Sequence, residues 1–354
     1  MMLRLNSIAS FKKKMKVSVS LLLFTLNLSA QNSADSLFNS QSPLRIALSI
    51  SLKEVEKSKK DSIYLKQNLL YQNSRNTWDS VQVGIRERGN FRSRECYFPP
   101  LWIKIKTKNG EGTIFEGNRK LKLVLPCYEK SGNNDLILRE YLCYKLFEEV
   151  SPYTFQTRLA DVDLTVSRKN KKTRYQLKGI FIEDINKAAT RLHAKVLKDI
   201  KLHPTALHDT SAVRFELFQY MISNTDWSTV YQHNAKLIMV EPDKYISILY
   251  DFDMSGLVDA PYSIVSAVNG EQLPVQHVTE RIYRGFCRDP EVMEFVRKEF
   301  LSKKEKYLTI PDQLQEQLTS KDIVNIKEYL EEFFDKIKDE RSFKKNILDK
   351  CRVE

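Results

Sequence analysis

Residues 222–253 read I-S-N-T-D-W-S-T-V-Y-Q-H-N-A-K-L-I-M-V-E-P-D-K-Y-I-S-I-L-Y-D-F-D, and the interpretation of the whole chain depends on them. The first part, up to Asn234, has no apolar periodicity, which is typical of a loop. Two short apolar runs follow at 235–240 and 245–250, and a turn containing Pro242 separates them. This pattern predicts a β-hairpin.

Polar side chains stand at the open end of this hairpin, before its first strand and after its second. Asp226 and Asn234 precede the first strand, and Asp251 and Asp253 follow the second. Because the two strands run side by side in opposite directions, these groups are expected to lie close together. Carboxylate and amide oxygens are the ligands that Mg²⁺ and Mn²⁺ prefer. The segment therefore predicts a metal site at Asn234 and Asp251, with Asp253 as a further candidate ligand.

Two other interpretations of the same residues exist. The run from Asp251 to Gly256 resembles the first half of a calcium-binding loop, but the last position of that loop should be a bidentate Glu. Tyr262 stands there instead, so the calcium interpretation fails. Asn and Asp in loops also often do no more than cap turns. Their presence on both sides of one hairpin favours the metal site.

Five motifs, in the same chain order, resemble those of the CotH family, the atypical kinases typified by spore coat protein H. They are R-E-R-G-N at 86–90, L-R-E-Y-L-C-Y at 138–144, G-I-F-I-E at 179–183, N-T-D with H-N at 224–234, and Y-D-F-D at 250–253. Together they span roughly half of the chain. Two departures occur. Phe91 follows R-G-N where Ser is usual, and residues 250–255 read Y-D-F-D-M-S where the family usually has W-D-Y-D-G-T.

Members of this family are similar to protein kinases in fold, and they transfer phosphate from ATP to Ser or Thr of proteins. The resemblance implies an α+β, protein-kinase-like two-lobed fold with a helical C-terminal extension. In that layout Asp226 would accept the proton of the substrate hydroxyl. Asn234 and Asp251, with Asp253, would bind the Mg²⁺ or Mn²⁺ that accompanies ATP.

The same layout places a cation on a strand, paired with a carboxylate of the following helix, to bind the ATP phosphates. Lys122 and Glu140 fit these positions. Lys104 and Arg88 are alternatives, since the sequence does not fix the direction of the pleat, and each of these cations also suits a solvated sheet face. Trp227 is a candidate for stacking on adenine, although an aromatic residue beside a catalytic loop often only packs.

Residues 1–30 have the three parts of a secretory signal peptide. A basic region at 12–16 precedes an apolar run at 17–28, and L-S-A at 28–30 forms a cleavage site. We expect a periplasmic or extracellular protein with no stable membrane anchor. The rest divides into a loose leader at 31–43, a β-rich region corresponding to the small lobe at 44–184, and a catalytic and helical region at 185–354.

Charge limits the choice of partners. The net charge is +12, and it falls to +7 after cleavage because the first 30 residues contain five cations and no acid. No Arg-rich helix or aromatic–basic repeat accompanies this excess, so nucleic-acid binding is not expected. A basic surface suits an acidic or phosphorylated ligand equally well.

The five cysteines are scattered, and no C-x-x-C pair is present, which argues against a zinc site. Cys96 and Cys127 flank two adjacent predicted strands and are the best candidates for a disulfide. The other three, Cys143, Cys287 and Cys351, are expected to be buried thiols.

Apolar periodicity predicts further elements. Strands are expected at 44–52, 80–88, 101–106, 121–125, 158–166 and 174–182, and helices at 135–147, 187–202, 212–222, 291–307 and 321–348. Two functional alternatives to protein phosphorylation stay open. One is the transfer of AMP on the same scaffold, and the other is a non-catalytic exported binding protein. The protein substrate is not identified by the sequence.

Overall fold

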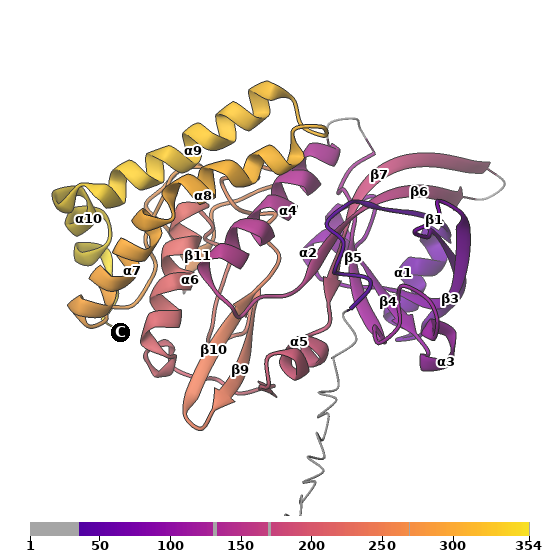
Figure 1. Cartoon of the computed structure of the whole chain (residues 1–354), viewed down its shortest axis with the longest axis horizontal. Helices are drawn as coiled ribbons and strands as arrows, with labels where there is room; N and C mark the ends of the chain where they lie inside the picture. The colour runs from indigo at the N-terminus through magenta and orange to yellow at the C-terminus, as the bar shows by residue number, and fades with distance from the viewer. Residues whose placement is uncertain (1–34, 130–132, 169–170, 269, 354) are drawn as a thin grey trace, which may run out of the picture. The chain divides into compact units, whose positions relative to one another are not determined.

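The computed structural model describes residues 35–129, 133–168, 171–268 and 270–353. The predicted signal peptide therefore lies outside the described residues. From Asp35 onward the chain forms one compact unit. It contains a β-barrel, followed in sequence by a region of helices and a small sheet (Figure 1).

Seven strands close the barrel in the order β1-β2-β3-β4-β5-β7-β6. Neighbouring strands are antiparallel except for β1 and β6, which pair in parallel. The strands are β1 (Leu44–Ser51), β2 (Leu65–Gln72), β3 (Trp78–Glu87), β4 (Leu101–Ile105), β5 (Lys120–Val124), β6 (Thr157–Arg168) and β7 (Lys171–Glu183).

This closed, mixed barrel shows that the predicted protein-kinase-like two-lobed fold is wrong. Alternating apolar residues identified most of the strands correctly, because alternation reports which face of a strand is buried. It does not report which strands become neighbours. The parallel pairing of β1 with β6 joins Leu44 to Ala160 and Ser51 to Ser167, and this long-range contact closes the sheet.

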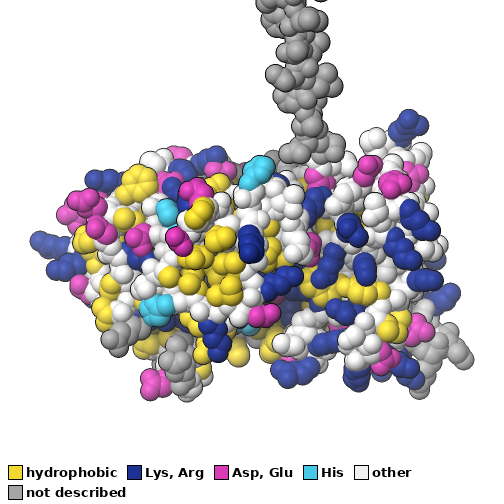
Figure 2. Space-filling model, turned by 90° about the horizontal axis from the view of Figure 1, so that it is seen from below, with side chains coloured by type: hydrophobic (Ala, Val, Ile, Leu, Met, Phe, Trp, Pro, Cys, Tyr) yellow, Lys and Arg dark blue, Asp and Glu magenta, His cyan; other side chains and the backbone are white. Residues whose placement is uncertain are grey.

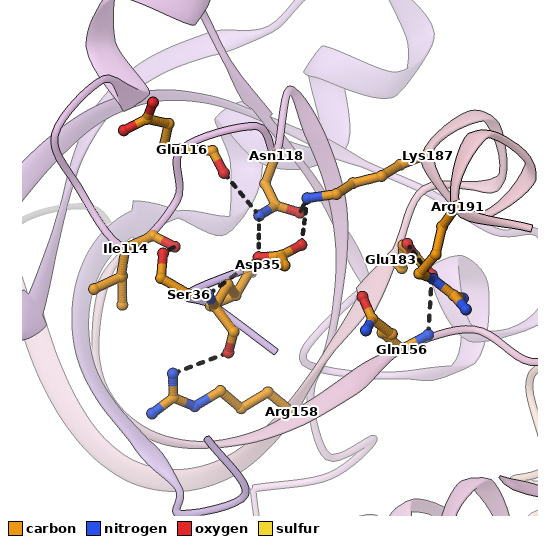
Figure 3. Close-up of polar contacts among 11 residues, drawn as sticks. Asp35, Ser36, Ile114, Glu116, Asn118, Gln156, Arg158, Glu183, Lys187 and Arg191 are labelled. Atoms are coloured by element: carbon orange, nitrogen blue, oxygen red, sulfur yellow. Dashed lines mark hydrogen bonds and ion pairs between the residues drawn. The ribbon is translucent and has the colours of Figure 1, made fainter. Parts of the chain in front are cut away.

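The barrel core is apolar, and it includes residues that we expected to be loose. Leu37 and Phe38 are buried in it, so the described part of the 31–43 leader is packed. Figure 3 shows how polar contacts hold this segment: the Asp35 carboxylate pairs with Lys187 and accepts a hydrogen bond from Asn118 (3.0 Å). Arg158 donates to the main-chain oxygen of Leu37 (2.9 Å).

Short helices lie between the barrel strands in the sequence, and longer helices form most of the rest of the unit. They are α1 (Leu52–Lys60), α2 (Phe91–Glu95), α3 (Thr107–Gly110), α4 (Asn133–Val150), α5 (Ile185–Arg191), α6 (Asp209–Met221), α7 (Pro290–Ser302), α8 (Lys304–Thr309), α9 (Ser320–Lys338) and α10 (Glu340–Asn346). Among these described helices, none is long and apolar enough to span a membrane.

The predicted hairpin is confirmed. β9 (Ala235–Glu241) and β10 (Lys244–Leu249) are antiparallel, and β8 (Lys195–Leu197) adds a third strand beside β9. The predicted helix at 187–202 is wrong beyond Arg191. The chain turns at His193, which has φ +51°, and then pairs with β9 through backbone hydrogen bonds. A second small sheet contains β11 (Ala267–Val268) and β12 (Glu271–Gln272).

Two disulfides are present in the structure. Cys96 and Cys127 are bonded, with their Cα atoms 4.4 Å apart, as predicted. Cys287 and Cys351 are also bonded, so our expectation of buried thiols is wrong for this pair. The two lie 64 residues apart with helices between them, and nothing in the sequence indicates that the chain returns. Cys143 is a buried free thiol, as expected.

Candidate functional site

The open end of the β9–β10 hairpin brings the two polar segments together. The last register pair is Ala235 with Leu249, and the Tyr250 N–H then donates to the Asn234 carbonyl at 3.1 Å. Asn234 is thus held opposite Tyr250, next to Asp251. A backbone hydrogen bond therefore holds Asn234 at the same end of the hairpin as Asp251.

Asp226 is the centre of a hydrogen-bonded group. The Asn234 amide nitrogen donates to its carboxylate Oδ2 (2.9 Å) and to its main-chain oxygen (2.8 Å). Nε2 of His233 lies 2.9 Å from the other carboxylate oxygen, Oδ1, and donates to it. This hydrogen bond to Asp226 raises the pKa of His233. Both oxygens of Asp226 are therefore oriented by neighbours, and the amide oxygen of Asn234 is left as the group that can coordinate a cation.

Asp251 begins the second polar segment in an unusual backbone conformation. Its φ is +66°, a region that Asp and Asn enter more readily than most residues. Its N–H donates to the Tyr144 hydroxyl of α4 at 2.8 Å, which ties the end of β10 to that helix. Its Oδ2 lies 4.0 Å from a guanidinium nitrogen of Arg88, just after β3. Asp251 is thus the carboxylate that faces the barrel cations.

Asp253 belongs to a buried ion cluster with Arg92 and Glu140. Arg92 lies 3.8 Å from Asp253 Oδ2 and 3.7 Å from Glu140 Oε2, and its guanidinium also donates to the Leu125 carbonyl. Burial raises the pKa of Glu140 well above its usual range. Burial, with the charge of Asp251 added, raises the pKa of Asp253 to about 7.

This cluster corrects one predicted pair. Glu140 was expected to pair with Lys122, but its partner is Arg92. Glu140 does lie on the helix that follows β5, as expected. Its side chain, however, points toward α2 and the Asp253 segment and not toward Lys122. Sequence reasoning missed Arg92, because nothing in the run 92–95 distinguishes the buried Arg92 from the exposed Arg94.

Lys122, on β5, is buried beside two aromatic rings. Its Nζ lies 3.6 Å from the ring centre of Tyr250 and 4.8 Å from that of Phe155. Burial, and next the charge of Arg88, lowers the pKa of Lys122 well below its usual range. Lys236, on β9, lies on the same Tyr250 ring at 5.6 Å, and burial and Arg88 lower its pKa too. Arg88, Lys122 and Lys236 form what we call the cationic group.

Two predicted site residues lie elsewhere. Trp227 is 5% exposed and packs against Phe215, and Arg284 lies over its ring at 5.0 Å. Its Nε1 donates to the Asn224 carbonyl, so the indole is a core residue and not a platform for adenine. Lys104 is exposed on the outer face of β4, over the Tyr64 ring at 5.2 Å.

The side chains present fit a cation that arrives with its own oxygen ligands. Among the described residues, no three His, Cys, Asp or Glu side chains are placed to hold a metal ion by themselves. Mg²⁺ is usually bound by one or two carboxylates and takes its other ligands from water and substrate phosphates. Asn234 and Asp251, which lie at the same end of the hairpin, would provide such a partial set. The buried Oδ2 of Asp253 lacks a hydrogen bond, as does Arg92 Nε at 3.8 Å from it, so a proton or a second cation could also bind this oxygen.

Comparisons with known proteins do not assign this chain to a family. No family model and no curated protein matches it. Function is therefore inferred from the residues of this site and from the motif resemblance.

The raised pKa of Asp253 predicts a pH-dependent stability. Between about pH 4 and pH 7 the folded chain holds a proton on Asp253 that the unfolded chain has released, so this group lowers stability as pH rises. Asp253→Asn has no proton to lose. We expect its free energy of unfolding to rise relative to wild type by on the order of 1 kcal/mol or more from pH 5 to pH 8.

Thermal unfolding at several pH values checks this expectation, with the exposed Asp259→Asn as the matched control. A difference that is constant with pH, or that grows toward pH 5, would show that Asp253 is already ionised in the folded protein at pH 5.

Proposed function

We propose that this protein is an exported phosphotransferase that transfers phosphate from ATP to a Ser or Thr hydroxyl of a protein, with Mg²⁺ or Mn²⁺. One observation carries the proposal. Asp226 and Asn234 are hydrogen-bonded to each other at the open end of a hairpin, and at the same end the Asp251 carboxylate lies 4.0 Å from Arg88 of the cationic group. Acidic groups for a metal and an acceptor hydroxyl, next to cations for phosphate, are the elements that phosphoryl transfer requires.

Asp226 is the residue that we assign to the hydroxyl group that accepts the phosphate. Hydrogen bonds from His233 and Asn234 fix the direction of its carboxylate. A carboxylate held in this way can orient the hydroxyl and accept its proton as the oxygen bonds to phosphorus and ADP leaves. His233 is a positioning residue here, because it acts through Asp226.

The cationic group supports the binding of polyphosphate. Burial, and after it the charge of Arg88, lowers the pKa of both Lys122 and Lys236, so Arg88 and the protonated lysines repel one another in the absence of a ligand. An anionic phosphate chain would relieve this repulsion. A divalent cation held by Asn234 and Asp251 would neutralise further phosphate charge.

Two features support export. The sequence pattern of residues 1–30 is one, and the two disulfides are the other, since disulfides are typical of oxidising compartments. The resemblance of five motifs to CotH kinases supports the reaction, not the fold.

The test is intact-mass spectrometry of the exported protein incubated with ATP, Mn²⁺ and a mixture of candidate acceptor proteins. We expect a mass increase of one phosphate group on the chain or on an acceptor, and none without the metal. An AMP-sized mass increase would show that the protein transfers AMP and not phosphate. No adduct, together with no ATP binding in calorimetry, would mean that the protein is a non-catalytic binding protein.

A further inference from the structure

The outer face of strands β2 to β5 carries a second group of cations, apart from the hairpin. Register places Lys66, Gly84, Lys104 and Lys120 side by side in one row across the four strands. The residues that alternate with them, such as Val83 and Ile103, point into the barrel core and are buried, so the lysines point outward. Lys106, just after β4, is exposed as well.

The neighbouring row adds aromatic residues. It contains Arg86, Trp102 and Lys122, and Tyr64 lies just before β2 at the same level. We call the set Tyr64, Lys66, Arg86, Trp102, Lys104, Lys106 and Lys120 the outer basic face. Figure 2 shows Lys and Arg side chains gathered over the part of the molecule that the barrel forms.

Each ring on this face is flanked by two cations. Arg86 and Lys104 lie 4.8 and 5.2 Å from the centre of the Tyr64 ring. Gly84 leaves space for this ring, since a Cβ there would lie 2.9 Å from Tyr64 Cβ. The rings orient the cations, although a cation–π contact at such an exposed site is weak.

The same arrangement surrounds Trp102. Lys120 and Arg88 lie 3.8 and 5.4 Å from its ring centre. The two rings of this face therefore already have cations as neighbours.

The cations of this face lack acidic partners. Among the described residues, no carboxylate lies within ion-pair distance of Lys66, Arg86, Lys104, Lys106 or Lys120. Lys104 and Lys120 are direct cross-strand neighbours, and like charges in that position destabilise a sheet. Burial lowers the pKa of Lys120, and Arg86 and Arg88 add to the effect against the opposing charge of Asp184. A small cavity of about 160 Å³ opens between Tyr64, Lys66, Lys104 and Lys106.

We propose that the outer basic face binds an acidic polypeptide segment, whose carboxylate or phosphate side chains pair with Lys66, Lys104 and Lys106. A nucleic acid fits less well. Single-stranded nucleic acids bind by stacking bases on aromatic rings, and here cations flank both rings. The proposal does not depend on phosphate transfer. The face adjoins Lys122 of the candidate site, so a protein docked on it would lie beside Asp251 and Asp226.

The test compares two variants that lose the same charge. One is Lys66→Gln/Lys104→Gln/Lys106→Gln on the outer basic face. The other is Lys172→Gln/Lys344→Gln/Lys345→Gln at exposed positions elsewhere. We expect the first to weaken binding of poly-L-glutamate at low salt by at least about tenfold, and the second by less than about threefold. Binding is measured by fluorescence anisotropy on the full chain.

Folding and specificity are checked in the same series. The first variant should keep or raise the thermal midpoint, because Lys104→Gln removes a like-charge pair. Oligothymidylate and phosphatidylglycerol vesicles serve as competing probes, and we expect both to bind more weakly than poly-L-glutamate. Equal losses in the two variants would overturn the proposal, since net charge alone would then explain binding. Tighter binding of oligothymidylate or of vesicles would overturn the choice of a polypeptide.

Discussion

Arg92→Met is expected to lower the free energy of unfolding by roughly 3–5 kcal/mol at pH 8, the range seen when one partner of a buried ion pair is removed. Arg92 is 6% exposed, and it is the cation nearest to both Glu140 and Asp253. Without it, two buried carboxyl groups and the Leu125 carbonyl lose their partner. Met keeps much of the apolar volume of the Arg92 side chain, so the loss of stability is due more to the missing charge than to lost packing.

The pH dependence of this loss distinguishes charge from packing. The pKa values of Glu140 and Asp253 are already raised, so both groups can take up protons when Arg92 is removed. We expect the loss to be smaller at pH 5 than at pH 8 in urea unfolding. The exposed Arg94→Met on the same short helix is the matched control. Adding Glu140→Gln and Asp253→Asn should restore much of the stability. A loss that is equal at both pH values and is not restored would mean that Arg92 acts through packing alone.

Local pattern and long-range pairing explain which parts of the fold were predictable. Strands β3 and β4 and the β9–β10 hairpin follow from alternation and from turn residues, which are local properties of the chain. The closure of the barrel does not, because it depends on the parallel contact between β1 and β6. β2 was missed because consecutive polar residues, such as Lys66, Gln67 and Asn68, occupy both faces of the strand, so apolar and polar residues do not alternate there.

The candidate site divides in the same way. The placement of Asp226, Asn234 and Asp251 at one end of the hairpin was predictable because the hairpin connects them, and a hairpin has only one open end. The partners of Glu140 and Lys122 were not, since they depend on the rotation of α4 against the barrel. Trp227 was misassigned because an aromatic residue next to a polar loop has the same sequence signature whether it is buried or exposed. Its contacts with Phe215 and Arg284 place it in the core.

Asp226→Asn and Asp251→Asn are expected to separate acceptor activation from metal binding. Asp226→Asn removes the proton acceptor. Its amide oxygen can still accept from Asn234, and its NH2 then faces Nε2 of His233, which can accept when the imidazole is neutral. Phosphate transfer should fall by about 10²–10⁴-fold, the usual contribution of a general base. Binding of Mg-ATP, measured by calorimetry, should change by less than about threefold, because this carboxylate is assigned to the acceptor and not to the metal.

Asp251→Asn should instead abolish metal-dependent binding of ATP and, with it, transfer. Asn tolerates the φ of +66° at this position, so the backbone need not change. The thermal midpoint should stay the same or rise, because the charge of Asp251 acts against Asp253. Asp243→Asn is the matched control: Asp243 is exposed at the other end of the same hairpin and has φ +61°. If these Asp residues only cap turns, Asp251→Asn will lower the thermal midpoint and leave nucleotide binding as it is in wild type. Equal binding of Mg-ATP by wild type and Asp251→Asn would show that the metal assignment is wrong.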